Sequence, residues 1–445
     1  MDALNLALMK KFLQSLNPLQ LLMYGYFGIL VIGFILLRLP FMRTTSIPVL
    51  DDLFTTTSAL STTGLATVDV SADYTFWGQL VILVLIQLGG LGYMSLGSFF
   101  VLIRRKKLSS RNSELLQYDF SLPKGFSVLH FIRSMVFFTV GLELVGAIAL
   151  AFIFHAAGES NVVWLGFFHS ISAFCTAGFS LFSDGFVPFQ NNFALNAVIS
   201  ILAIAGALGF IVFTDLFARA SGAKQRITYT SRIILRFTFA GILLGAAMLF
   251  LSDDNIAAMP AEQGLLVAFF QSMTAFTTVG FNTYDVGAIV PAPLFGVILL
   301  MIIGASPSGT GGGMKSTTFT ALYAQLKSTF RGDSKTLYLN RIIPEHKVAM
   351  ATSNFFFYVL TICVGAYLLL LTEEAAVYQV LFEAVSALGT VGLSTGITGS
   401  LSVLGKIIII FLMFLGRIGP LSFGMVVFRP SEATTVTAEV EDLAI

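Results

Sequence analysis

Charged residues are scarce in this chain of 445 residues: Asp, Glu, Lys and Arg together make up 11%, whereas a soluble protein carries about 25%. Cysteine is almost absent, and the two present, Cys175 and Cys363, provide neither a disulfide framework nor a metal-binding pattern. No acid–base or metal cluster typical of an enzyme is visible. Hydrophobic residues, by contrast, make up 56%, and 44 residues are phenylalanine. The composition therefore indicates an integral membrane protein that is not an enzyme.

Eight long apolar segments follow one another in four pairs, and each is long enough to cross roughly 30 Å of hydrocarbon. A shorter semi-apolar run lies inside each pair, as at 164–174 and 265–276. Such a run is too short to cross and is predicted to be a half-helix that enters the membrane and turns back. The eight predicted spans are 20–39 and 76–103, 127–155 and 194–218, 233–251 and 293–325, and 349–371 and 401–428.

A short phrase recurs four times, once inside each pair, and always ends in glycine: Gly64, Gly178, Gly280 and Gly392. Each copy has Ser or Thr six residues before the glycine, Ala five before it and Thr two before it. Four copies in register predict an all-α membrane protein of four tandem helix–pore helix–filter loop–helix repeats around a pseudo-four-fold central pore. The predicted parts are a cytoplasmic N-terminus (1–19), four repeats (20–107, 108–222, 223–332 and 333–430) and a cytoplasmic tail (431–445).

Loop charges predict the orientation of the chain. Lys and Arg gather in the loops between the pairs, as at 104–107 and 327–347, which places both termini in the cytoplasm by the positive-inside rule. The loops inside the pairs are acidic. We interpret their carboxylates as solvated, with the alternative that they raise the cation concentration at an outer mouth. They are Asp51, Asp52, Asp69, Asp73, Glu159, Asp184, Asp253, Asp254, Asp285, Glu373 and Glu374.

The chemistry of the repeated phrase suits a cation filter. Backbone carbonyls can replace the hydration shell of a cation without adding net charge, and glycine permits the backbone angles that aim them at one axis. Two copies contain the Thr-Val-Gly that begins the potassium-channel filter sequence, although any single copy could serve small-residue helix packing instead. The predicted potassium-binding residues are Thr62, Thr63, Gly64, Thr176, Ala177, Gly178, Thr278, Val279, Gly280, Thr390, Val391 and Gly392.

The second helix of the third pair is interrupted by a stretch of Gly, Ser and Thr around one proline. Because glycine and proline disfavour helix, and unwound backbone at membrane depth must line a cavity or be buried in protein, we predict a flexible gate beneath the filter. A static kink is the alternative. Met314 stands where a phosphate-binding loop needs glycine, so no nucleotide site is expected on this chain. The predicted gate residues are Gly304, Ala305, Ser306, Pro307, Ser308, Gly309, Thr310, Gly311, Gly312, Gly313, Lys315 and Arg417.

Four charged residues lie in apolar surroundings. Arg417, in the last membrane helix, is expected to face the pore or a partner because an arginine at that depth is costly. Lys315 either anchors the gate or extends to the cytoplasmic interface. Glu143 is interpreted as a hydrogen-bonded helix contact and Asp215 as interfacial.

The chain resembles the membrane subunits of Ktr-type potassium uptake systems, in the Trk/Ktr/HKT superfamily. The four glycines and the stretches 87–92, 304–315 and 416–420 carry the match. In that family, glycine at all four filter positions goes with potassium preference, and serine in the first filter goes with sodium transport. The resemblance also implies an intramembrane gating loop at 304–315, with Arg417 in the cavity beside it.

The same resemblance implies partners. It predicts a homodimer in the inner or plasma membrane with one pore in each subunit, surrounded by lipid, without nucleic acid. A separate cytoplasmic ring of the RCK type would bind nucleotides and regulate transport, with the basic loops and the acidic tail (439–445) as contacts. Cys175 and Thr277 stand where family members typically carry Asn and Arg, which leaves sodium activation open. The alternatives are a sodium-selective or mixed-cation HKT-like pathway and an alternating-access cation symporter.

Overall fold

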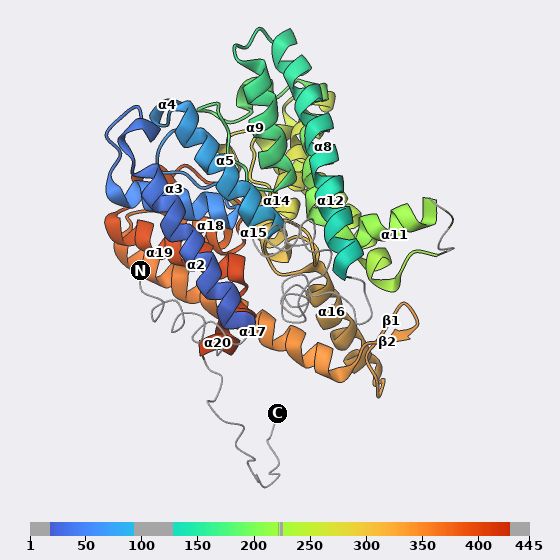
Figure 1. Ribbon diagram of the computed structural model, residues 1–445. Helices are drawn as coiled ribbons and strands as arrows, with labels where there is room; N and C mark the ends of the chain where they lie inside the picture. Colours follow the sequence, from blue (N-terminus) through green and yellow to red (C-terminus); the bar gives the residue numbers. More distant parts are fainter. Residues whose placement is uncertain (1–17, 93–127, 221, 223–225, 428–445) are drawn as a thin grey trace.

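The structure is a computed structural model that describes residues 18–92, 128–220, 222 and 226–427 (Figure 1). These residues form helices and one two-stranded hairpin, which confirms the predicted all-α membrane class. The N-terminal segment, the acidic tail and the basic residues at 104–124 lie outside the described residues. The first repeat contains α2 (Pro18–Leu37), η1 (Pro40–Met42), α3 (Val49–Ser61), α4 (Val70–Asp73) and α5 (Phe76–Leu91).

The other three repeats follow the same order of long helix, short helix and inner helix. The second has α8 (Val128–Ala156), α9 (Val162–Phe174), η2 (Val187–Phe189), α10 (Phe193–Leu208) and α11 (Phe210–Ala220). The third has α12 (Tyr229–Ser252), α13 (Asp254–Ala257), α14 (Ala261–Thr277), η3 (Val286–Ala288), α15 (Pro291–Ile303) and α16 (Ser316–Arg331). The fourth has β1 (Leu337–Tyr338), β2 (Arg341–Ile342), α17 (Glu345–Thr372), α18 (Val377–Leu388), η4 (Thr398–Ser400), α19 (Val403–Ile418) and α20 (Pro420–Val427).

The first helix of each repeat is long and apolar enough to cross a membrane. The four such spans are Leu19–Leu37, Ser134–Ala156, Tyr229–Ser252 and Glu345–Thr372. Their outward faces expose large apolar side chains, among them Phe152 at 72% and Leu251 at 80%, as expected of a surface that lipid covers. Buried apolar side chains form two large clusters, one mainly from the first two repeats and the other mainly from the third and fourth.

The inner helices differ from the prediction, which placed an interruption in the third repeat alone. That prediction is wrong. In the second repeat α10 and α11 meet at 98°, and in the fourth α19 and α20 meet at 93°. Each inner helix ends at a glycine with positive φ, a conformation that side chains disfavour. These glycines are Gly92 (φ 76°), Gly209 (82°), Gly304 (34°) and Gly419 (88°); the predicted continuation of the first inner helix to residue 103 lies outside the described residues.

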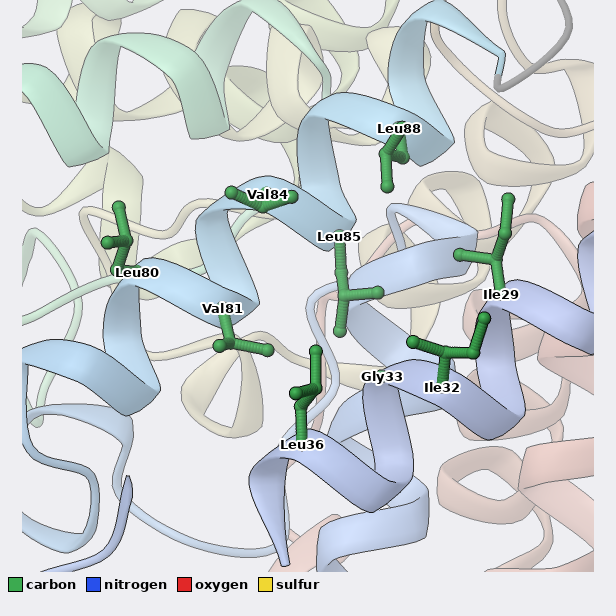
Figure 2. Close-up of a pocket in the computed structure, with 9 residues that line it drawn as sticks. All are labelled: Ile29, Ile32, Gly33, Leu36, Leu80, Val81, Val84, Leu85 and Leu88. Atoms are coloured by element: carbon green, nitrogen blue, oxygen red, sulfur yellow. The ribbon is translucent and has the colours of Figure 1, made fainter. Parts of the chain in front are cut away.

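An apolar groove of about 300 Å³ runs between α2 and α5 on the outside of the first repeat (Figure 2). Its lining is hydrocarbon contributed by Ile29, Ile32, Gly33, Leu36, Leu80, Val81, Val84, Leu85 and Leu88. Such a surface offers no oxygen ligand to a cation, so the groove does not belong to an ion pathway.

Several acidic residues of the loops inside the pairs form buried hydrogen bonds or ion pairs. The prediction that their carboxylates are solvated is wrong for these residues. Asp52 is fully buried and accepts hydrogen bonds from Arg38 (2.7 Å) and the Tyr74 hydroxyl (2.8 Å). Asp253 is also fully buried and accepts from the backbone N–H of Val290 at 3.0 Å. Lys406 forms an ion pair with Asp51 at 2.6 Å. These carboxylates hold helix ends together instead of facing water.

Candidate functional site

The four short helices α3, α9, α14 and α18 end in the same way. The threonine two residues before each repeated glycine has left-handed backbone angles, with φ between 47° and 58°. The next residue then donates its N–H to the carbonyl oxygen six residues before the glycine, where every copy carries Ser or Thr. These bonds are Thr63 to Ser58 (2.8 Å), Ala177 to Ser172 (2.8 Å), Val279 to Thr274 (3.1 Å) and Val391 to Ser386 (2.8 Å).

The four repeated glycines form a closed ring, named here the glycine ring (Gly64, Gly178, Gly280 and Gly392). Each has positive φ, between 66° and 95°. A Cβ atom on any of them would overlap the carbonyl oxygen of the residue that precedes the next glycine, and the fourth copy meets the first. The pairs are Gly64 with Ala177 and Gly178 with Val279, both at 2.4 Å, and Gly280 with Val391 and Gly392 with Thr63, both at 2.1 Å.

This ring needs glycine for two independent reasons. The backbone angles disfavour a side chain, and the neighbouring carbonyl leaves no room for one. Twelve residues were predicted to form a filter, and the structure brings the four loops that contain them together. Convergent carbonyl oxygens are suitable ligands for a partly dehydrated cation.

The stretch 304–315, named here the broken segment, lies against these loops. Gly312 donates its N–H to the Thr278 hydroxyl at 2.8 Å, and the Thr176 hydroxyl donates to that of Thr310 at 3.2 Å. A Cβ atom on Gly312 would lie 2.0 Å from the Thr390 hydroxyl. The broken segment therefore contacts the threonines of the second, third and fourth repeats directly.

The broken segment also forms backbone hydrogen bonds with the end of α10. The N–H of Ser306 donates to the Ala207 carbonyl at 3.1 Å, and the N–H of Thr310 donates to that of Gly206 at 3.0 Å. In turn, the N–H of Phe210 donates to the Ser308 carbonyl at 3.2 Å. Because the segment is unwound, its backbone N–H and carbonyl groups lack helical partners. These bonds provide partners for several of them, as a buried segment requires.

Arg417 connects the broken segment to the first repeat. Its guanidinium donates to the Thr310 carbonyl at 2.8 Å and to the Thr62 hydroxyl at 3.0 Å. It also donates to the carbonyl oxygen of Gly89 at the end of α5. Lys315 donates to the Gly311 carbonyl at 2.6 Å, so it folds back over the broken segment and does not extend to an interface.

Glycines of three inner helices allow close packing on the short helices. A Cβ atom on Gly89 would lie 2.1 Å from the Leu60 carbonyl oxygen, and one on Gly206 would lie 1.9 Å from that of Phe174. Gly416 has the same relation to Leu388, at 2.1 Å. The sequence contained these glycines, but only the structure shows which carbonyls they approach.

A polar cluster behind the second loop combines residues from three segments. Gln87 donates to both carboxylate oxygens of Glu143, at 3.1 and 3.2 Å. The Cys175 thiol contacts the Gln87 side-chain oxygen at 3.4 Å. The interpretation of Glu143 as a hydrogen-bonded helix contact is confirmed, but no sequence pattern indicates Gln87 as its partner. Asp215 is buried and accepts from Ser231 at 2.7 Å, which joins α11 to the start of α12.

Comparison with known proteins identifies the family to which this architecture belongs. A family model named TrkH, described as a cation transport protein, matches residues 25–435. The chain belongs to the TrkH family. The resemblance drawn from the sequence is therefore confirmed. The family consists of membrane transporters of cations, so the prediction that the chain is not an enzyme is confirmed as well.

Two curated relatives in the TrkH family match nearly the whole chain. The Ktr system potassium uptake protein B of Bacillus subtilis is 34% identical over 414 residues, which cover 92% of each chain. The potassium/sodium uptake protein NtpJ of Enterococcus hirae is 35% identical over 422 residues, again 92% of each. The crystal structure of TrkH from Vibrio parahaemolyticus superposes with a TM-score of 0.71 at 20% identity, over 92% of this chain and 85% of that one. This last likeness concerns the fold.

Proposed function

We propose that this TrkH-family chain is the pore subunit of a potassium uptake system and that the glycine ring is its selectivity filter. The observation that carries the proposal is the closure of the ring: four loops place backbone carbonyls around one centre, each held by an identical bond to its short helix. Potassium is favoured because all four positions are glycine and because similar proteins are named as potassium uptake proteins.

The broken segment is the proposed gate. It contacts threonines in the filter loops of the second, third and fourth repeats. Arg417 hydrogen-bonds both to this segment and to Thr62 in the loop of the first repeat. An ion that leaves the ring toward the inner helices would have to displace this segment. Arg417 also places a positive charge beside the path, which opposes cation passage until the segment and the arginine move apart.

Further parts of the proposal follow from the loop charges and from the Ktr relatives. Both termini would be cytoplasmic. Two copies of the chain would associate, and a cytoplasmic nucleotide-binding ring of the RCK type would regulate them. Copurification with such a ring, followed by measurement of flux with ATP and with ADP, tests this part.

A mixed potassium and sodium pathway is the second candidate, because NtpJ is named a potassium/sodium uptake protein and is 35% identical to this chain. Sodium would then be a transported ion as well as an activator. The two candidates differ in whether sodium competes with potassium for uptake. Excess sodium should leave potassium uptake unchanged in a selective pathway and should reduce it in a mixed one.

The ring itself is tested with one substitution at two glycines of the same repeat. Gly392 (φ 93°) lies in the ring, whereas Gly396 (φ 97°) has no heavy atom within 4 Å of a built Cβ. Both should be expressed as Gly→Ser variants in cells that depend on this chain for potassium. We expect Gly392→Ser to lose preference for potassium over sodium and Gly396→Ser to keep it. Equal preference in the two variants would refute the ring as the filter.

A further inference from the structure

A second polar position recurs in the four repeats, nine residues before each ring glycine. Its side chains differ, and the repeated phrase does not suggest a role for them. All four are buried, with exposed fractions of 0% or 1%. They lie on the four short helices that precede the ring. The four residues are Thr55, His169, Gln271 and Glu383.

Glu383 receives four hydrogen bonds from the segment that follows Gly392. One carboxylate oxygen accepts from the Ser394 hydroxyl at 2.7 Å, the Thr395 N–H at 2.9 Å and the Thr395 hydroxyl at 3.3 Å. The other accepts from the Thr398 hydroxyl at 2.8 Å. A fully buried carboxyl is costly unless it is satisfied in this way, so the geometry of these donors is strongly specified.

His169 makes the matching contacts in the second repeat. The Leu181 N–H donates to His169 Nε2 at 3.1 Å, and the Ser180 hydroxyl lies 3.2 Å from the same nitrogen. Because Nε2 must accept, the proton of the neutral ring is on Nδ1, which donates to the Leu165 carbonyl at 2.8 Å. The imidazole is thus fixed between its own helix and the segment after Gly178.

The two contacts are equivalent in register although the acceptors differ chemically. Leu181 and Thr395 both stand three residues after their ring glycine, and Ser180 and Ser394 both stand two after it. Each backbone contact therefore joins two residues twelve positions apart, with the ring glycine between them.

The first and third repeats are held differently. In the third, Gln271 donates to the Tyr284 carbonyl at 3.0 Å, so the direction of the bond is reversed. The first repeat has the shorter side chain of Thr55 at this position. There the link lies one turn earlier, where Asp52 accepts from Tyr74.

We propose that Glu383 and His169 are positioning residues for cation selectivity, which act by holding the segments after Gly392 and Gly178 against the short helices before them. This inference rests on the proposed function of the glycine ring. The bond from the residue before the glycine already fixes one side of each ring position, and the buried acceptor fixes the other. With both sides fixed, the ring carbonyls cannot move inward to coordinate a smaller cation at low cost.

Neither side chain needs to touch the ion, so the test must separate selectivity from simple loss of folded protein. We would measure potassium uptake and its inhibition by sodium in cells that express Glu383→Ala, Glu383→Gln, His169→Ala or His169→Gln. Glutamine retains an acceptor oxygen at either site. Matched controls are Glu374→Ala and His155→Ala, which change the same residue types at exposed positions.

We expect both alanine variants at the buried sites to weaken discrimination against sodium by about tenfold, which corresponds to roughly the free energy of one hydrogen bond. The glutamine variants should recover part of it, and the two controls should match the unmodified chain. Potassium uptake that falls while the sodium sensitivity stays constant would show a structural role only and would overturn the proposal. So would buried-site variants with unchanged sensitivity.

If the Glu383 variants fail to accumulate in the membrane, Ser394→Ala combined with Thr398→Val removes two donors and keeps the carboxyl. Unchanged discrimination in this double variant would equally overturn the proposal. The potassium preference of the unmodified chain distinguishes failure of the proposed filter from failure of the positioning role. If it does not prefer potassium, the proposed filter fails together with the positioning role; if it does and the variants match it, the positioning role alone fails.

Discussion

Arg417 donates a hydrogen bond of 2.8 Å to the Thr310 carbonyl, which joins the last inner helix to the unwound stretch of the third repeat. The two residues are 107 positions apart. The same guanidinium reaches Thr62 in the first loop and Gly89 at the end of α5. One side chain therefore connects three of the four repeats, and this relation is the basis of the first prediction.

Arg417→Gln should raise potassium flux. The substitution removes a positive charge beside the proposed path. It also replaces the guanidinium with a shorter amide, which weakens the hydrogen bonds to Thr310 and Thr62. Uptake of a potassium tracer at matched membrane abundance is the measurement, with Arg331→Gln, a change at an exposed arginine, as the control. Flux that is unchanged or reduced in a well-accumulated variant would contradict an inhibitory role for the arginine.

Deletion of residues 311–313 should also raise flux. Gly312 supplies the N–H that reaches Thr278, and Gly311 supplies the carbonyl that receives Lys315. A shortened segment would lose both hydrogen bonds and, in the proposed mechanism, would leave the inner side of the ring open. Tracer flux in proteoliposomes gives the answer, and equal or lower flux in a folded deletion variant would count against a gate at this place.

Gly206→Ala should strongly destabilise the folded protein, whereas Gly141→Ala should not. A Cβ atom at Gly206 would lie 1.9 Å from the backbone oxygen of Phe174, while Gly141 has no heavy atom within 4 Å. We expect a loss of about 3 kcal/mol or more at Gly206 and a neutral or slightly stabilising change at the helical Gly141. Thermal unfolding in detergent compares the two, and equal melting behaviour would disprove the packing argument.

Gln87→Leu should destabilise the protein by about 1–3 kcal/mol, because it leaves the buried Glu143 carboxyl without the two hydrogen bonds of the amide. Glu143→Gln preserves a hydrogen-bonding partner for Gln87 and should cost less. Chemical or thermal unfolding of the purified variants measures the difference. If both substitutions have the same small effect, the cluster does not contribute to stability.

Asp51 and Lys406 should show a coupling free energy of at least about 1 kcal/mol in a double-mutant cycle. Their ion pair of 2.6 Å joins the first pore-side helix to the last inner helix, with side-chain exposures of 7% and 16%. Because both groups are largely desolvated, removal of one partner leaves the other uncompensated. The cycle needs Asp51→Asn, Lys406→Met and the double variant, and strict additivity would contradict the coupling.

Much of this architecture could be predicted because it follows from local patterns. Apolar length predicts the four long helices, and the repeated Ser/Thr, Ala, Thr and Gly predict four equivalent helix ends. In the first and fourth copies the serine at the first of these positions accepts the N–H of the ring glycine, from Gly64 to Ser58 and from Gly392 to Ser386, both at 3.1 Å. The breaks at Gly209 and Gly419 were not predicted, although Gly419 is followed by Pro420, a pair that marks turns.

The sequence by itself determined that the chain lies in the membrane, that four units repeat, and that glycine occupies one position in all of them. Only the tertiary structure decided how the units differ: that Glu383 and His169 bind the same backbone position with different chemistry, and that Asp51, Asp52 and Asp253 hold helix ends. The physical reason is distance along the chain. Periodicity and backbone preference act within a few residues, whereas contacts such as Arg417 with Thr62, 355 positions apart, arise only when the ring closes.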